Sequence, residues 1–208
     1  MKKTILLISL FLLGACVSPQ VAVNQNADFS DIKRVAVLTF SGTNGDVAAD
    51  FMTQSLLMSG ADVVERQRLS SVLQEHSLTE SKYFDAGTAK QIGKLLGVDA
   101  MFVGTVVKYT DAGKYLVNTS KGRLITGVTE VNSSSIHSEG SVAGLPNSQI
   151  LSTSASVSLM ARMIDVQTGS VMWSASMSYE GFDIQTAMQA ITDSFVHSLK
   201  SFWPALTK

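Results

Sequence analysis

Cys16 is the only cysteine among the 208 residues, and its surroundings give its thiol a defined chemistry. It follows two lysines, an apolar run over residues 4–12 and the tripeptide Leu13-Gly14-Ala15. A basic start, a short apolar segment and small residues before the cut are typical of a cleaved secretory signal. The apolar run is shorter than the roughly 20 residues that a membrane-spanning helix needs. Residues 1–15 are therefore predicted to be a signal peptide; the alternatives are a signal with an incidental cysteine and a spanning helix.

The tripeptide ahead of Cys16 resembles the lipobox of bacterial lipoprotein signal peptides. The resemblance implies that Cys16 is acylated, so it is the predicted lipidation site. Each buried methylene of an acyl chain contributes about 0.8 kcal/mol, and stable attachment takes more than one chain. Val17 replaces the Asp that retains such lipoproteins in the inner membrane, which favours the outer membrane with the body facing the periplasm. Residues 16–31 are polar and lack periodicity, and they are predicted to be a lipid-anchored tether.

Motifs of catalysis are missing from the sequence. It contains no His-Glu-x-x-His, no Gly-x-Ser-x-Gly, no P-loop and no dinucleotide-binding glycine pattern. The histidines are isolated: His76 is predicted at the edge of the core, His197 is predicted to be solvated, and His137 has no partner in sequence. Serines gather over 133–158 without an accompanying base, as in linkers and polar strand faces. No catalytic, cofactor-binding or metal-binding residue is predicted, and the chain is predicted not to be an enzyme.

Composition limits the partners. Removal of residues 1–15 leaves 193 residues, enough for one compact domain, which is predicted over 32–208. The remaining 14 basic and 17 acidic side chains give a net charge of −3, and this argues against a nucleic-acid-binding surface. Acylation of Cys16 would leave no thiol for a disulfide or a cysteine metal site.

The first half of the domain alternates strands and helices. Runs of apolar and β-branched residues predict strands, and apolar residues at helical spacing predict helices. The strands are expected at 34–40, 62–65 and 100–108, and the helices at 47–59, 67–76 and 86–96. Asp46 is the predicted N-cap of the first helix, and Gly60 and Gly97 are predicted to end the first and third helices.

The second half contains two strands and the clearest helix. Strands are predicted at 155–166 and 170–179, joined by a tight hairpin at 165–169. Pro204 is predicted to stop the last helix, whose apolar stripe comprises Ile184, Ala187, Met188, Ile191, Phe195, Leu199 and Phe202. Trp173 and Trp203 are interpreted as core and edge aromatics. The order β-α-β-α-α-β, insertion, β-β-α predicts an α/β (α+β) fold, a mixed β-sheet flanked by helices.

The insertion at 109–154 is too long for an ordinary connection in a compact domain. Polar and apolar residues alternate at 154–159 and more weakly at 124–131. Such alternation suits a long β-hairpin, including one in a membrane barrel, whose strands take about 9–11 residues. The alternative is a Ser/Gly/Asn-rich loop without membrane contact.

Several segments, in this order, resemble the curli production assembly/transport (CsgG and HfaB) family of outer-membrane lipoproteins. They are Arg34-Val-Ala-Val-Leu-Thr-Phe40, Val63-Val-Glu-Arg-Gln-Arg-Leu69, Val72-Leu-Gln-Glu75, Ile92-Gly-Lys-Leu-Leu-Gly-Val-Asp-Ala100, Val103-Gly-Thr-Val-Val107 and Ala161-Arg-Met-Ile-Asp-Val-Gln-Thr-Gly-Ser-Val-Met-Trp173. Together they span most of the chain after the lipobox.

The resemblance implies a ring of protomers that forms an export channel, in which each protomer adds two β-hairpins to a barrel and a loop narrows the pore. The sequence departs on two points. The last helix begins almost directly after the strand that ends near Tyr179, so there is no room for a second hairpin. The narrowing loop is reduced to about 41–46, with Asn44 but no Tyr or Phe.

The resemblance predicts a non-enzymatic outer-membrane component for assembly or export of an envelope structure, acting as a homo-oligomeric ring. Its expected partners are the outer membrane, through Cys16, and exported subunits or envelope-assembly proteins. The alternative is a tethered periplasmic binding module, such as an activator of a peptidoglycan synthase or a flagellar-ring component.

Overall fold

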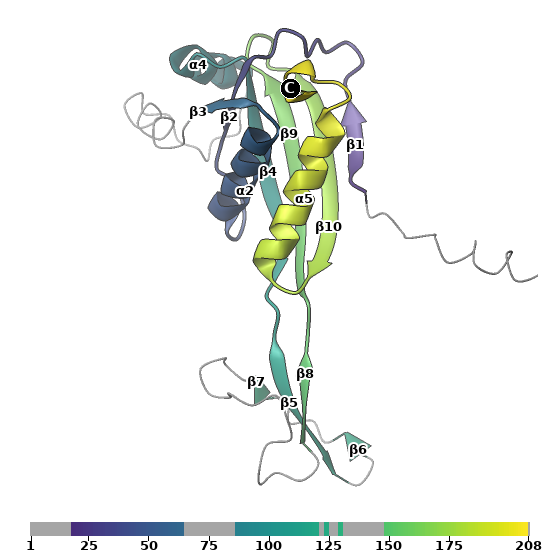
Figure 1. The fold of residues 1–208 in the computed structure, drawn as a ribbon. Helices are drawn as coiled ribbons and strands as arrows, with labels where there is room; N and C mark the ends of the chain where they lie inside the picture. The colour runs from purple at the N-terminus through teal and green to yellow at the C-terminus, as the bar shows by residue number, and fades with distance from the viewer. Residues whose placement is uncertain (1–17, 65–85, 121–122, 125–128, 131–147, 208) are drawn as a thin grey trace, which may run out of the picture.

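The computed structural model describes residues 18–64, 86–120, 123–124, 129–130 and 148–207. Its main sheet has six strands in the order β1-β10-β9-β4-β2-β3, shown in Figure 1. They are β1 (Gln20–Val23), β2 (Arg34–Val37), β3 (Asp62–Val64), β4 (Ala100–Thr110), β9 (Ala155–Asp165) and β10 (Val171–Gly181). The pairs β2–β3 and β2–β4 are parallel, whereas β4–β9, β9–β10 and β10–β1 are antiparallel. The predicted mixed sheet of an α+β fold is confirmed.

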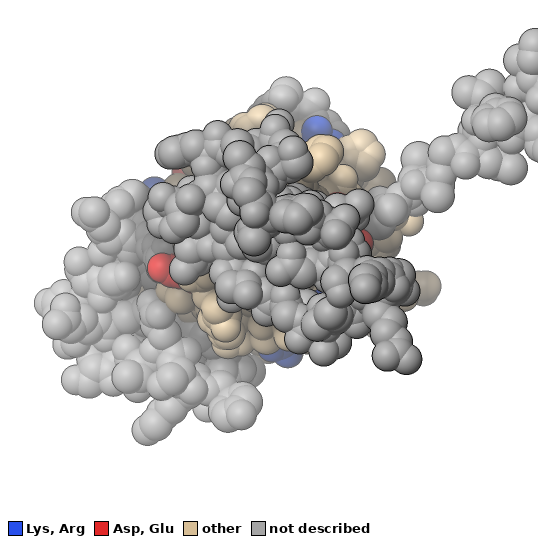
Figure 2. All heavy atoms as spheres, turned by 90° about the horizontal axis from the view of Figure 1, so that it is seen from below, with Lys and Arg blue, Asp and Glu red and all other residues tan. Residues whose placement is uncertain are grey.

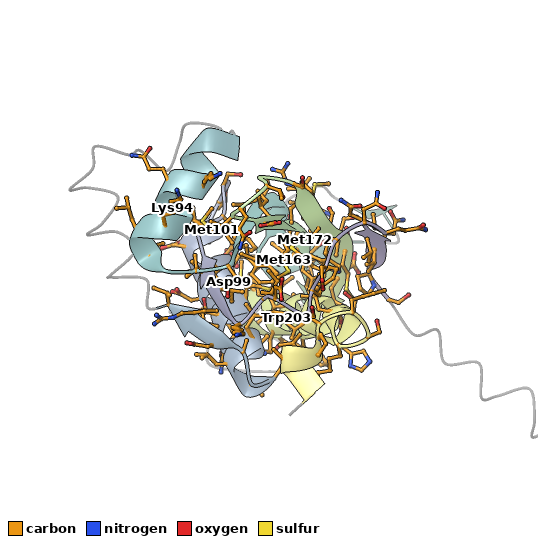
Figure 3. The ribbon with its side chains drawn as sticks, turned by 90° about the horizontal axis from the view of Figure 1, so that it is seen from above. Lys94, Asp99, Met101, Met163, Met172 and Trp203 are labelled. Carbon is orange, nitrogen blue, oxygen red and sulfur yellow. The ribbon has the colours of Figure 1, made fainter. Side chains whose placement is uncertain are left out.

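Helices cover both faces of this sheet. Helices α2 (Gly45–Met58) and α5 (Ile184–Leu199) lie side by side on one face, and α4 (Ala86–Leu96) covers one end of the other (Figures 1 and 3). Strand β2 is buried on both sides because Val35 and Val37 face the first layer while Ala36 and Leu38 belong to the smaller apolar cluster with Leu96 of α4. The continuous apolar run at the start of the domain therefore reflects a strand that lies between two layers.

Aromatic side chains fill the larger core between the sheet and α5. Phe102 of β4 lies 6.3 Å from Trp173 of β10 and 6.3 Å from Trp203, measured between ring centroids. Trp173 also meets Phe195 of α5 edge-on at 5.8 Å. Trp203 is fully buried, so it belongs to the core and not to its edge. In Figure 3, Trp203 lies on the α5 side of the sheet and Met101 on the α4 side.

Most predicted boundaries agree with the structure, but the predicted cap of α2 is wrong. Asn44, not Asp46, is the N-cap, and it has a left-handed backbone (φ 54°) with no side-chain cap. Asp46 lies in the first turn, where its charge suits the helix dipole. Gly60 (φ 89°) follows the end of α2, and Gly97 (φ 66°) follows α4, as expected of glycines that end helices.

The hairpin between β9 and β10 is confirmed. The Asp165 carboxylate accepts hydrogen bonds from the backbone N–H of Gln167 (2.7 Å) and from the Thr168 hydroxyl (2.8 Å). Gly169 supplies a positive φ of 74°. The side chain of Asp165 thus stabilises the turn locally, as Asp does in many tight turns.

The apolar stripe of the last helix is correct except at its end. Ala187, Met188, Ile191, Phe195 and Leu199 are buried, whereas Phe202 is 44% exposed. The helix ends at Leu199, so Phe202 leaves the helical spacing, and Pro204 begins a short 3-10 helix, η2 (Pro204–Thr207), instead of ending α5. The spacing of apolar residues alone does not show that α5 ends at Leu199, because the sequence has no strong helix-stop residue directly after it.

The predicted tether over 16–31 differs from the structure from Ser18 onward. Gln20–Val23 form β1, an edge strand with all four residues in register with β10, and Phe29 is buried in the larger core. A four-residue strand is too short to show periodicity in sequence, and its partner β10 lies about 150 residues away in the chain. Residues 20–31 therefore belong at least in part to the folded body and not to a tether.

The insertion over 109–154 contains a hairpin, but with shifted bounds. Strand β4 continues to Thr110 and β9 begins at Ala155; between them, β5 (Lys114–Ser120) pairs antiparallel with β8 (Ser148–Ser152) and extends away from the body (Figure 1). The short strands β6 (Arg123–Leu124) and β7 (Thr129–Glu130) pair with β5. The alternation at 154–159 belongs to β9, where Val157 and Leu159 are buried in the core, so it does not indicate a membrane strand.

Some predictions fall outside the described residues. They are the signal peptide over 1–15, lipidation of Cys16, the helix over 67–76, His76 and His137. None of the helices within the described ranges is both long and apolar enough to cross a bilayer.

Candidate functional site

The chain enters the sheet at Gln20, four residues after Cys16, and the described residues begin at Ser18. Gln20 pairs with Ser176 of β10, and Ser18 lines the same surface depression as Ser176 and Ser178. Ser18 therefore lies beside the second half of β10, the half that leads to Gly181. Two residues of chain span at most about 7 Å, so the connection from Ser18 back to position 16 is short.

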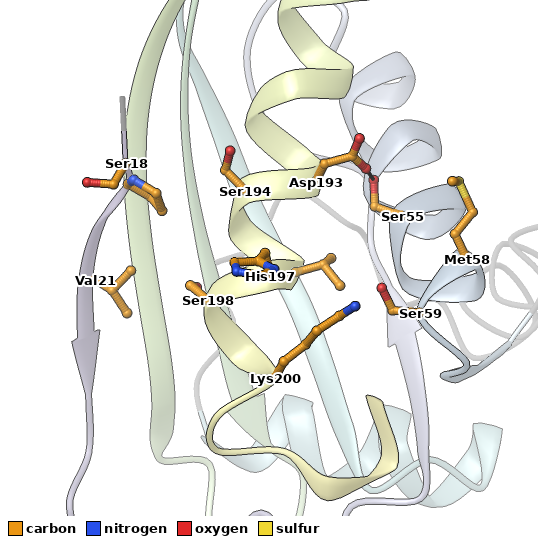
Figure 4. Close-up of a pocket in the computed structure, with 12 residues that line it drawn as sticks. Ser18, Val21, Ser55, Met58, Ser59, Asp193, Ser194, His197, Ser198 and Lys200 are labelled. Atoms are coloured by element: carbon orange, nitrogen blue, oxygen red, sulfur yellow. Dashed lines mark hydrogen bonds between the residues drawn. The ribbon is translucent and has the colours of Figure 1, made fainter. Parts of the chain in front are cut away.

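A groove of about 690 Å³ lies between β1 and the paired helices (Figure 4). One wall is formed by Ser18, Pro19 and Val21. The opposite side carries residues of α2 and α5 together with the residues directly after these helices: Ser55, Met58, Ser59, Asp193, Ser194, Val196, His197, Ser198 and Lys200. His197 is exposed, as predicted, and points into the groove.

The polar groups at the α2–α5 contact bind one another. The buried Ser55 hydroxyl donates to Oδ1 of Asp193 at 2.7 Å and lies 3.0 Å from the Thr192 hydroxyl. The Gln189 amide also donates to Asp193 Oδ1, at 2.8 Å. These bonds join the two helices and leave the carboxylate engaged in structure.

The groove serines are occupied in the same way. Ser194 donates to the carbonyl of Ala190 and Ser198 donates to that of Phe195, each at 2.7 Å. Ser198 also accepts from Nε1 of Trp173 at 3.2 Å. A serine nucleophile needs a base that takes its proton; here the protons of Ser194 and Ser198 go to helix carbonyls, although His197 is nearby in sequence. These two hydroxyls are therefore not paired with a base in the groove.

A second surface is the side of β9 and β10 that faces away from α2 and α5. Small polar side chains dominate it, and the Ser158 and Ser178 hydroxyls lie 2.7 Å apart across the strands. Two apolar side chains are exposed among them, Met160 (44%) and Val107 (66%). Val107 is the extra residue of a β-bulge between Val106 and Lys108. The predicted polar strand face of the serine-rich region is present here.

The turn between β10 and α5 is short and capped. Asp183 is the N-cap of α5, and its Oδ1 accepts from the backbone N–H of Thr186 at 2.7 Å. This hydrogen bond lowers the pKa of the Asp183 carboxyl from its ordinary value. The residue before it, Phe182, is 93% exposed. Only Phe182 and Asp183 separate β10 from α5, which confirms that no second hairpin fits at this position.

Sequence reasoning did not identify Phe182 or Val107. Phe182 stands between a strand and a helix and belongs to neither pattern, and the exposure of Val107 depends on a bulge that no local motif predicts. Within the described ranges, no three side chains of His, Cys, Asp or Glu gather as a metal site would require.

The described residues form a mixed sheet with α2 and α5 on one face, α4 at one end of the other and a hairpin extension. Their surface has a groove beside β1 and a polar strand face. A family model described as "Curli production assembly/transport component CsgG" matches residues 15–199, and the chain belongs to this family.

Solved structures with similar folds have low sequence identity. A PelC dodecamer from Paraburkholderia phytofirmans is 15% identical, with 91% of this chain and 99% of that chain covered and a TM-score of 0.47. Lipoprotein GNA1162 from Neisseria meningitidis is 17% identical, with coverage of 81% and 97% and a TM-score of 0.47. The C-terminal domain of LpoB from Escherichia coli is 14% identical, with coverage of 76% and 90% and a TM-score of 0.43. A comparison with curated proteins found no match.

Proposed function

We propose that this protein is an outer-membrane lipoprotein, anchored through acylated Cys16, that serves as a non-enzymatic, homo-oligomeric component in the assembly or export of an envelope structure. The observation that carries the proposal is the family match over residues 15–199, which includes Cys16 and nearly the whole body. A scaffold role is consistent with the groove, where Asp193 and the hydroxyls of Ser55, Ser194 and Ser198 are engaged in structural hydrogen bonds.

The position of Ser18 favours this function over a long-tethered activator. A periplasmic module that reaches a distant enzyme needs a long connection to its lipid. Here Ser18 already lies beside β10, and the two residue steps back to Cys16 span at most about 7 Å. The body is therefore held at the membrane, as suits a membrane-bound ring or platform.

The hairpin of β5 and β8 gives the oligomer a second element. It continues the ladder of β4 and β9 beyond the body, and Lys114 to Asn118 pair with Ser152 to Ser148. We assign this extension to contact with either the membrane or a neighbouring protomer. The chain retains one hairpin of the family arrangement, so a complete channel is not part of the proposal.

Acyl labelling and envelope fractionation test the proposed anchor. Wild-type protein should incorporate labelled palmitate and fractionate with the outer membrane. Cys16→Ser should incorporate none and be released from the membrane or remain uncut. Outer-membrane attachment of a mature Cys16→Ser body would refute the anchor. Recovery of a peptidoglycan synthase with the solubilised protein would favour the activator function instead.

A further inference from the structure

The end of the body that carries the β10–α5 turn has features that the oligomeric scaffold does not explain. Phe182 exposes 93% of its surface at this turn, more than any other large apolar residue among those described. An isolated exposed Leu or Val is common on protein surfaces, but a whole phenylalanine ring in water forfeits a large apolar contribution. Its position in the fold indicates what covers it.

The hairpin leaves the body at the same end. Gly181 pairs with Ala155, and Thr110 pairs with Ser156. Phe182, the residue after Gly181, therefore lies where β4 ends, where β9 begins and where the hairpin extension starts. Figure 1 shows the β10–α5 turn at the end of the body from which β5 and β8 continue. The ring therefore lies at the base of the hairpin.

The start of the chain leads toward this end as well. Strand β1 is antiparallel to β10, and Gln20 pairs with Ser176. The residues before Gln20 therefore lie beside the residues of β10 that follow Ser176. Ser18 lies beside Ser176 and Ser178, and the path from Ser178 to Phe182 is about 14 Å at the usual strand rise. The two residues up to Cys16 cover as much as about 7 Å of this path. An acyl chain on Cys16 would thus enter a membrane beside the Phe182 turn.

The charges near the turn permit contact with a lipid surface. Asp183 directs its carboxylate to the N-terminus of α5. Glu180 and Lys108 are exposed and of opposite sign, and the exposed Asp111 directly follows β4. Seen from the hairpin end, the described atoms in view are mostly uncharged, with a few acidic and basic side chains among them (Figure 2).

We propose that Phe182 is a membrane-insertion residue: its ring enters the lipid monolayer that holds the acyl chains of Cys16 and fixes the orientation of the body on the membrane. This inference rests on the proposed lipid anchor, and its occupant is a phospholipid monolayer. Segments that lie in the membrane interface bury Trp, Phe and Leu side chains at the boundary between headgroups and acyl chains. A second contact point beside the acyl group would restrict rotation of the body about its short connection.

Tryptophan substitution tests this depth. Phe182→Trp in the detergent-extracted lipoprotein is reconstituted into phosphatidylcholine vesicles with or without bromine-labelled acyl chains. The native Trp173 and Trp203 are fully buried and give a constant background. The matched control is Val171→Trp, a 40% exposed position at the opposite end of β10. We expect blue-shifted emission and strong bromine quenching at 182 and neither effect at 171.

Other outcomes overturn the inference. Water-like, unquenched emission at 182 in membrane-bound protein excludes insertion. A blue shift without bromine quenching assigns Phe182 to a second copy or another protein surface. If mass spectrometry finds Cys16 unacylated, the proposed anchor fails. Membrane insertion of Phe182 can then still be tested after the Cys16 thiol has been coupled to a maleimide-bearing lipid with a single acyl chain. With that weak anchor, Phe182→Ser should lower vesicle partitioning by roughly tenfold and Val171→Ser should not.

Discussion

The indole Nε1 of Trp203 donates a hydrogen bond of 2.9 Å to the backbone carbonyl of Ile32. The two residues are 171 positions apart, and both are buried. Ile32 stands just before β2, the strand with helices on both of its sides. Trp203 therefore connects the segment after α5 to the segment that leads into β2.

Replacement of Trp203 should be costly in two separable steps. Trp203→Phe keeps an aromatic ring but leaves the Ile32 carbonyl without its partner, and this should lower the free energy of unfolding by about 1–3 kcal/mol. Trp203→Ala also creates a cavity and should cost about 3–5 kcal/mol. Urea denaturation measures both values, and equal stability of Trp203→Phe and wild type would show that the hydrogen bond contributes nothing.

Phe195 and Phe202 form a matched pair. Phe195 is fully buried against Trp173, so Phe195→Ala should lower the free energy of unfolding by about 3–5 kcal/mol. Phe202 is 44% exposed and touches the core only at its border, so Phe202→Ala should cost clearly less. Melting curves of the two variants measure this difference. Similar losses of stability in both variants would mean that the apolar stripe of α5 extends to Phe202.

This pair also illustrates how far sequence can predict the fold. Spacing and turn residues located α5, the β9–β10 hairpin and the buried strands, because these depend on local patterns. They did not locate β1, whose four residues are held by pairing with β10, or the end of α5 before Phe202. The candidate site was predicted only at Cys16, from a lipobox. The groove and the exposure of Phe182 and Val107 arise from packing between segments that are distant in the chain. The spacing of apolar residues within one segment does not predict such packing.

Gly104 is required by the close approach of Phe40 to β4. A Cβ at this position would lie 2.5 Å from the Phe40 ring and 2.8 Å from the carbonyl oxygen of Met160. Gly104→Ala should therefore lower the free energy of unfolding by about 1–3 kcal/mol through overpacking. Phe40→Leu provides the test of cause: combined with Gly104→Ala, it should recover part of the loss. Strict additivity of the two changes would contradict the steric explanation.

Asp183 makes stability depend on pH. Its folded-state pKa is lowered, so the ionised cap stabilises the fold above the unfolded pKa of about 4 and the contribution is lost as pH falls through the folded pKa. Melting temperatures measured from pH 7 down to pH 2 should fall over this acidic range. Asp183→Asn keeps an acceptor for Thr186 without titrating, so its profile should be flatter than that of wild type. Identical profiles would exclude Asp183 as a contributor to this pH dependence.

Native mass spectrometry of the detergent-extracted protein tests the central claim most directly, because one spectrum reports both acylation and subunit number. We expect a homo-oligomer whose protomers lack residues 1–15 and carry the added mass of acyl chains at Cys16. A monomer at micromolar concentration, or a protomer with an unmodified Cys16, would contradict the account of an anchored, oligomeric envelope component.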